Sequence, residues 1–241
     1  VPHMLSLALA PKATIEARLR SSNTLRRATE SASCSGRDTL RKDTAKVVAS
    51  ICAIAMTADS SVSGARIRVH CILSLINLLG EDDAFDEFTA YNEEVAIVLV
   101  EALRDAHTIV VSAGAQLLRK ISEIDVVSQF IVLKDEWFSA MLHLLETVNE
   151  ESVNPHLLSA VINVAGNAKG QFPMARCARL LQILVELAFE AKTAPQRAVQ
   201  ACKCCANLLA FPDNCSEMKR LSPSLVNAML ECTEAATSAL E

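Results

Sequence analysis

The sequence predicts an all-α fold, a right-handed α-solenoid of stacked three-helix repeats. Three observations favour it: four similar segments recur at a fixed period, apolar residues recur at matched offsets from them, and the 241 residues include only 6 Gly and 7 Pro. A period in the low forties is typical of solenoids whose repeats each hold two or three helices. We therefore expect a helical repeat domain rather than a sheet-based enzyme.

A polar position marks the repeat most clearly, because it recurs at intervals of 43, 43 and 44 residues as Asn77, Lys120, Asn163 and Asn207. Apolar side chains lie 11, 18 and 22 residues after it. They are Phe88, Ile131, Met174 and Met218, then Val95, Phe138, Leu181 and Leu225, then Leu99, Leu142, Val185 and Met229. The last two columns are four residues apart, which places both on one face of an α-helix.

The N-terminal segment differs from the repeats. We interpret residues 1–4 as a cloning remnant and residues 5–42 as a basic N-terminal helix or cap followed by a linker. The helix is expected over 14–31 and the linker over 33–37. This helix either caps the stack or belongs to a truncated repeat.

Residues 43–241 are expected to form about four repeats and terminal helices. Polar caps and apolar periodicity first predict a helix capped by Asp38 or Asp43, with Val47, Val48, Ile51 and Ile54 on its apolar face, and then a helix between Ser61–Gly64 and Leu79. The next repeat is expected to hold a short helix around Phe85 and Phe88 and a helix from Asn92 to about Asp105. After it come a short helix over 126–133, a helix from Asp135 through Leu145, and a helix that begins with an Asn154 cap and Pro155. Gly166, Gly170, Pro195, 212–214 and 222–223 mark the remaining turns. The rhythm of one short and two long helices predicts three helices per repeat.

Cysteine usage and hydropathy bear on the compartment. The nine Cys are an odd number, no signal-peptide pattern precedes them, and most lie on apolar helix faces. The longest apolar runs are far shorter than the roughly 20 residues of a membrane-spanning helix. We expect a soluble protein of a reducing compartment, cytoplasmic or nuclear, that is not secreted.

The segments Ala201–Ala210, Cys71–Gly80 and Leu157–Gly166 resemble the third helix of armadillo repeats, which reads roughly small-Ala-x-x-Leu-x-Asn-Leu-Ala. The resemblance covers about residues 43–238 and is specific to the armadillo and HEAT-like superfamily rather than to one protein. It implies that the Asn column lines a concave groove and holds the main chain of a partner peptide. A side-chain amide suits this role, because it donates and accepts at once.

The chain also departs from the family. Lys120 offers only donors and a charge, and Leu73, Ser159 and Lys203 stand where import receptors place Trp, which argues against recognition of classical nuclear signals. The expected groove residues are Asn77, Lys120, Asn163, Asn207, His70, Gln116, Ser159 and Lys203. The alternative is that the Asn amides only tie neighbouring repeats together or face water.

Other patterns indicate packing rather than chemistry. Cys202-Lys203-Cys204-Cys205 contains a C-x-x-C spacing, but no second pair completes a zinc site, so small-residue packing is the favoured interpretation. Trp137 is a candidate partner anchor if it is exposed, although packing within or between repeats is the favoured alternative. We find no catalytic motif and expect no catalytic residue, cofactor, metal or small-molecule substrate.

Charge is distributed unevenly along the chain. Residues 1–46 carry nine Lys/Arg against four Asp/Glu, whereas the remainder carries 14 against 24. The basic residues Arg18, Arg20, Arg26 and Arg27 form a possible secondary surface for nucleic acid, acidic lipid or an acidic protein, and a solvated helix face is the competing interpretation.

The sequence thus predicts a non-enzymatic scaffold or adaptor that binds a peptide or helix of a partner protein in its concave groove. The alternative is binding of nucleic acid or acidic membrane through the basic N-terminal segment, and an enzyme concealed in the fold is a remote third interpretation. The partner's identity, the pathway and the oligomeric state do not follow from these patterns.

Overall fold

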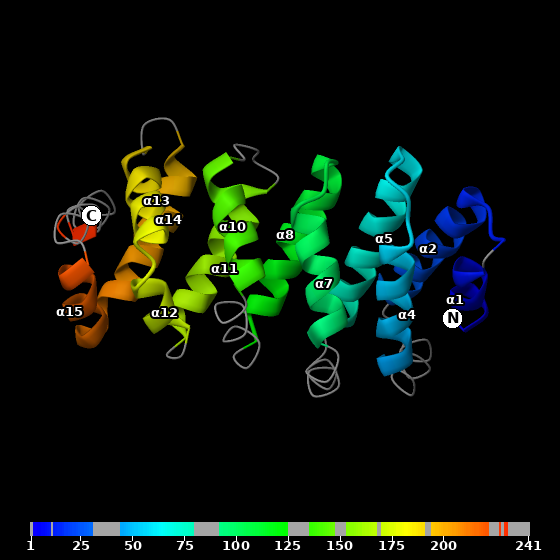
Figure 1. Ribbon diagram of the computed structural model, residues 1–241, viewed down its shortest axis with the longest axis horizontal. Helices are drawn as coiled ribbons and strands as arrows, with labels where there is room; N and C mark the ends of the chain where they lie inside the picture. The colour runs from blue at the N-terminus through cyan, green and yellow to red at the C-terminus, as the bar shows by residue number, and fades with distance from the viewer. Residues whose placement is uncertain are drawn as a thin grey trace. The chain divides into compact units, whose positions relative to one another are not determined.

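The computed structural model describes residues 2–10, 12–30, 44–79, 92–124, 135–147, 153–167, 170–190, 194–221, 227, 229 and 230. All regular elements within these ranges are helices (Figure 1). They are α1 (Pro2–Leu9), α2 (Ile15–Glu30), α4 (Thr44–Met56), α5 (Val62–Leu78), α7 (Asn92–Leu103), α8 (Thr108–Ser122), α10 (Asp135–Thr147), α11 (Asn154–Gly166), α12 (Gln171–Ala175), α13 (Ala178–Phe189), α14 (Pro195–Leu209) and α15 (Pro212–Leu221). The predicted all-α class is confirmed.

The chain divides into two compact units, Val1–Leu117 and Leu118–Glu241, with the division inside α8. In the first unit, α2 packs on α5 in one layer, while α1, α4 and α7 follow one another in a second layer. α1 also contacts α2, just as α4 contacts α5. The N-terminal segment, for which a separate cap and linker are predicted, therefore contributes two helices that pack with the helices that follow.

In the second unit, all three helices of one repeat, α12, α13 and α14, lie within the described residues. Its long helices α13 and α14 pack on each other and, respectively, on α10 and α11 of the preceding repeat, and α12 contacts both of them as well as α15. This repeat confirms the predicted order of one short and two long helices. The other predicted short helices, around Phe85 and over 126–133, lie outside the described residues.

The start of α5 shows how local sequence sets a helix boundary. The Ser61 hydroxyl accepts a hydrogen bond from the Gly64 backbone N–H at 3.1 Å, a side-chain N-cap. A Cβ at Gly64 would lie 2.1 Å from the Asp59 carbonyl oxygen, so only glycine allows the turn to approach α5 this closely. The turn is further fixed by a hydrogen bond from Ser61 Oγ to Asp59 Oδ1 at 2.5 Å.

The start of α11 corrects one expectation. The helix begins at Asn154 with Pro155 in its first turn, as predicted, but no side-chain capping bond is made there. The Asn154 side chain is instead buried, and neither its Nδ2 nor its Oδ1 has a hydrogen-bond partner. The Asn-Pro pair locates the helix start correctly, because proline suits a first-turn position, but the capping role assigned to Asn154 is wrong.

Candidate functional site

The polar column lies on the second long helix of successive repeats. Asn77 is on α5, Lys120 on α8, Asn163 on α11 and Asn207 on α14, and all four side chains are partly exposed. The apolar residues of these helices face the interior, including Leu75, Leu118, Val161 and Leu208. A fixed helical phase therefore brings one polar side chain per repeat to the rim of the core.

Each Asn amide contacts the helix that precedes it in the same layer. In the first unit, Asn77 Nδ2 donates to Thr29 Oγ1 of α2 at 3.2 Å. In the second unit, Asn163 Nδ2 donates to Ser122 Oγ at 2.9 Å and Asn207 Nδ2 donates to the Ile162 carbonyl at 3.3 Å. These bonds tie neighbouring repeats together, as the alternative interpretation of the column predicts. An amide has two N–H donors and an acceptor oxygen, so one such bond leaves part of its capacity for a ligand.

Lys120 is engaged within its own helix turn. Its Nζ donates to Glu123 Oε2 at 2.8 Å, and Arg119 Nε lies 3.5 Å from the other carboxylate oxygen. Burial opposes ionisation of Glu123, but the hydrogen bonds and charges of Lys120 and Arg119 outweigh it and lower the pKa of the carboxyl group. The positive charge of Lys120 is thus largely neutralised before any partner arrives.

His70 of the predicted groove is half-buried, and so is His156 on α11. His70 Nδ1 lies 3.1 Å from Ser22 Oγ of α2. Burial lowers the pKa of His70, and the charges of Arg26 and Arg66 lower it further; burial and then Arg119 act in the same direction on the pKa of His156. Both shifts favour the neutral form of the ring.

The remaining predicted groove residues differ in availability. Ser159 Oγ donates to the Pro155 carbonyl of its own helix at 2.7 Å. Gln116 is partly exposed, and Lys203 is exposed on α14. The Cys residues on either side of Lys203 are buried, and burial raises the pKa of the Cys202 and Cys204 thiols, so the favoured packing interpretation of the C-x-x-C spacing holds.

The secondary surface needs one correction. Trp137 is only 3% exposed, so it is a core residue of α10 and does not belong to the secondary surface. On α2, Arg20 pairs with Glu16 at 2.5 Å, Arg26 pairs with Glu30, and Arg18 Nη1 donates to the Thr57 carbonyl at 3.5 Å. Arg27 is exposed. The α2 arginines are thus partly neutralised by acidic groups on the same helix.

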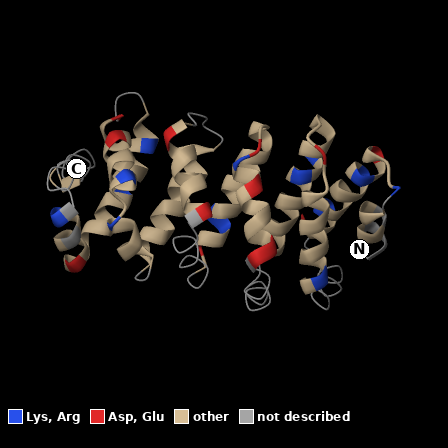
Figure 2. Cartoon of the chain, viewed as in Figure 1, with Lys and Arg blue, Asp and Glu red and all other residues tan. Residues whose placement is uncertain are grey.

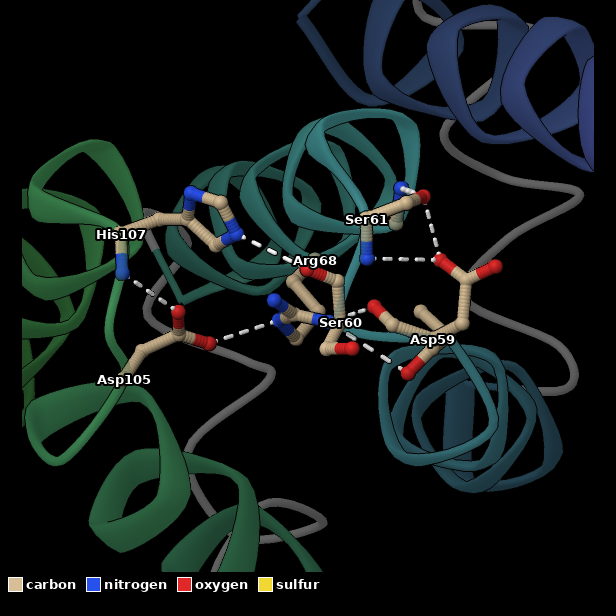
Figure 3. Close-up of polar contacts among 8 residues, drawn as sticks. Asp59, Ser60, Ser61, Arg68, Asp105 and His107 are labelled. Carbon is tan, nitrogen blue, oxygen red and sulfur yellow. Dashed lines mark hydrogen bonds and ion pairs between the residues drawn. The ribbon is translucent and has the colours of Figure 1, made fainter.

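A polar cluster that the sequence patterns did not reveal joins two inter-helix turns of the first unit (Figure 3). Arg68 Nε lies 2.8 Å from Asp105 Oδ2 in an ion pair without hydrogen-bond geometry at Nε, and the two side chains are 15% and 11% exposed. Arg68 Nη1 donates to the Asp59 carbonyl at 2.5 Å. Asp105 Oδ1 accepts from the His107 backbone N–H at 2.8 Å, and His107 Nε2 lies 3.0 Å from the Ser60 carbonyl oxygen.

This cluster borders a shallow pocket of about 290 Å³ between the α4–α5 and α7–α8 turns. Its walls include Met56, Arg68, Glu101, Arg104 and His107. Arg68 and Asp105 neutralise each other, and the exposed walls carry both signs of charge. Arg68 and Asp105 thus hold the two turns together, and we call this pair the Arg68 clip. The sequence patterns did not reveal it because it combines turn residues with a helix residue outside the repeated columns.

Comparison with solved structures identifies the fold. A crystal structure of computationally designed armadillo repeat proteins for modular peptide recognition has a TM-score of 0.74 and 17% identity, covering 99% of this chain and 98% of that one. A designed armadillo repeat protein in complex with the peptide (KR)4 has a TM-score of 0.72 and 16% identity, covering 96% and 98%. The fold is that of an armadillo-type α-solenoid.

A further designed armadillo repeat protein gives a TM-score of 0.71 at 17% identity, covering 98% of this chain and 99% of the designed one. No protein-family model and no curated protein matches the sequence. Within the described part of the chain, none of the armadillo helices has the length and apolarity needed to cross a bilayer. The predicted resemblance to armadillo repeats is confirmed at the level of the fold.

Proposed function

We propose that this armadillo-type chain is a non-enzymatic scaffold or adaptor that binds an extended segment of a partner protein along the face carrying the polar column. The observation that carries the proposal is the recurrence of partly exposed Asn amides in the same phase of successive repeats, each donating one hydrogen bond, among the described residues, to the helix that precedes it in its own unit. Amides that recur once per repeat are suited to forming hydrogen bonds with the main-chain N–H and C=O groups of an extended peptide.

Two further observations support a binding role over catalysis. The clustered thiols at 202–205 are buried, and burial raises the pKa of Cys202 and Cys204, so these thiols make poor nucleophiles. His70 and His156 lie in different repeats, and burial lowers the pKa of both rings. One designed protein of the same fold is described as bound to a peptide, which is compatible with this use of the fold.

The test compares loss of the amides with loss of the bonds that the amides make inside the protein. Peptides are selected from a displayed random library on the immobilised full chain, and their affinities are measured by fluorescence anisotropy. We expect the Asn77→Ala/Asn163→Ala/Asn207→Ala variant to lose roughly tenfold or more in affinity, since each lost hydrogen bond is worth about 1 kcal/mol.

The matched control is Thr29→Ala/Ser122→Ala, which removes the acceptors of two of the three inter-helix bonds but keeps every amide. This control should bind within about threefold of the wild type, although its thermal midpoint is lowered through the loss of two of the three inter-helix bonds. Equal losses of affinity in both variants would mean that the amides are structural only. Failure to select any peptide would contradict the proposed function itself.

A further inference from the structure

Charge is separated between the layers of the first unit. α2 carries four Arg and two Glu, and α5 carries two Arg and no acidic residue. α7, in the other layer, carries three Glu and no Lys or Arg. Figure 2 shows blue segments on α2 and α5 and red segments on α7, together with a blue segment on α4, whose one charged residue is Lys46. The layer that bears the polar column is therefore basic, although the whole chain has a net charge of −5.

The column extends one helix further toward the N-terminus than the sequence period indicated. Thr29 accepts from Asn77 in the first unit as Ser122 accepts from Asn163 in the second. Arg27 stands two residues before Thr29, and Lys120 stands two residues before Ser122. Arg27 is thus the column residue of α2. The repeat period of 43 residues did not reveal Arg27, because Arg27 lies 50 residues before Asn77.

A second cation lies on the same helix face as the amide. Arg66, His70 and Asn77 are separated by four and seven residues, the spacing of side chains along one face of α5. Arg66 lies near enough to His70 for its charge to lower the pKa of the ring, after the larger effect of burial. Arg66 and Asn77 thus flank the contact between α5 and α2.

Three of the six arginines on α2 and α5 form ion pairs within the protein. Arg20 pairs with Glu16, Arg26 with Glu30 and Arg68 with Asp105. Arg27 and Arg66 are exposed, and neither forms an ion pair with an acidic group of the described residues. Their charges remain available to a partner.

We propose that the α2–α5 face binds a partner segment rich in Asp and Glu, with Asn77 on its main chain and Arg27 and Arg66 on its carboxylates. This inference rests on the proposed function and adds its charge preference. Arginine suits the task because its planar guanidinium binds a carboxylate through two parallel hydrogen bonds. The preference is opposite to that implied by the (KR)4 peptide bound to a designed protein of the same fold.

The first experiment measures charge preference on the full chain. Fluorescein-labelled (DE)4, (KR)4 and (SG)4 peptides are titrated with protein in anisotropy at about 50 mM and about 200 mM sodium chloride. We expect (DE)4 to bind most tightly and to weaken as salt screens the contacts. Tighter binding of (KR)4 or equal binding of (SG)4 would overturn the charge inference while leaving the proposed function in place.

The second experiment locates the site. Arg27→Gln/Arg66→Gln is compared with Lys46→Gln/Arg104→Gln, which removes two exposed cations from α4 and the α7–α8 turn and so has the same net charge. We expect the first pair to weaken (DE)4 binding by about fivefold to thirtyfold and the second by less than about twofold. Equal losses would reveal diffuse attraction by the whole protein and contradict the assignment of this face.

Two further measurements distinguish a main-chain contact from a charge contact and a peptide site from a nucleic-acid site. Asn77→Ala should lower the affinity for (DE)4 and for (SG)4 by the same factor, because a contact with the peptide main chain does not depend on the charge of the peptide side chains. A labelled single-stranded RNA is titrated in parallel with the arginine variants. RNA that binds more tightly than (DE)4 and loses affinity with Arg27 and Arg66 would make the face a nucleic-acid site and overturn the proposal. If no peptide of any charge binds and none is selected from the random library, the proposed function fails rather than its charge preference alone.

Discussion

At the residue scale, the hydroxyl groups beneath the Asn column have a defined orientation. Thr29 Oγ1 donates to the Arg26 carbonyl at 2.7 Å, and Ser122 Oγ donates to the Arg119 carbonyl at 2.6 Å. Each hydroxyl has a single proton, so the lone pairs of its oxygen accept the Asn amide. Both buried hydroxyls therefore have a donor and an acceptor partner, and the contacts with Asn77 and Asn163 are made through the amide Nδ2.

The sequence predicted the Asn column but not its bonding partners. Asn77, Asn163 and Asn207 recur at a fixed period because each repeat places one polar side chain in the same helical phase. Thr29 and Ser122 lie outside that period, and the third acceptor is a backbone carbonyl, for which a side-chain pattern carries no signal. The position of the candidate site could thus be predicted, whereas its hydrogen bonds depend on how neighbouring helices pack.

The Arg68–Asp105 pair yields a prediction about stability. Asp105→Asn keeps an oxygen that can accept from the His107 N–H but removes the counter-charge of a guanidinium that is only 15% exposed. We expect a loss of about 2 kcal/mol in the free energy of unfolding, because a largely buried charge is left unpaired. The measurement is urea unfolding followed by circular dichroism.

The control for this prediction is Glu16→Gln, which breaks the ion pair with Arg20. The side chains of that pair are 69% and 79% exposed, so its loss should change the unfolding free energy by less than about 0.5 kcal/mol. Equal effects of the two substitutions would show that the Arg68 clip contributes no more than a surface ion pair.

At the element scale, α10 explains why Trp137 was placed on a candidate surface. The repeat columns assigned Phe138 and Leu142 to the core face, and a single face would leave the neighbouring position outside it. In α10, however, Ala140, Met141, Leu142, Leu144 and Leu145 are all buried. A helix that packs both on its own repeat and on the next one has an apolar arc wider than one stripe. Column alignment places Leu142 in the core correctly, but it also assigns Phe138 to the core, which is only partly buried, and it leaves out the buried Trp137.

The helix α2 provides the prediction at this scale. Its Leu25 is 2% exposed and its neighbour Thr24 is exposed, while α2 packs on α5. If α2 is an integral helix of the stack, Leu25→Ala should lower the unfolding free energy of the first unit by about 2–4 kcal/mol, through lost burial and a cavity. Thermal unfolding of this variant and of Thr24→Ala provides the measurement.

Thr24→Ala removes an exposed side chain from the same turn and should shift the thermal midpoint by no more than about 1 °C, since surface substitutions usually change little. A Leu25→Ala protein as stable as Thr24→Ala would mean that α2 is a loosely attached appendage. The sequence left open whether this helix caps the stack or belongs to a truncated repeat, because sparse apolar residues fit both arrangements.

At the scale of the whole molecule, the helices within each unit contact mainly the helices next to them in the chain or in the adjacent repeat of that unit. Within the second unit, α14 packs on α11 and α13, and α13 packs on α10 and α14. Each repeat is therefore stabilised mainly by its neighbours, and the unfolding of such arrays is governed by local interface energies. This differs from a domain with one central core, in which any core substitution affects all elements together.

Hydrogen exchange can distinguish these two kinds of stability. Leu181 is fully buried in α13, and we expect Leu181→Ala to cost about 2–4 kcal/mol and to speed amide exchange in α12, α13 and α14. Exchange in α2 and α4 of the first unit should stay within about twofold of the wild type. In a repeat array the stability of a helix depends on the helices that it contacts, and α2 and α4 are not among the helices that pack on α13. Gln182→Ala, an exposed neighbour on the same helix, should leave all of these rates unchanged. Uniform acceleration across α2, α4 and α13 in the Leu181 variant would show cooperative unfolding of the whole chain and contradict repeat-by-repeat stability.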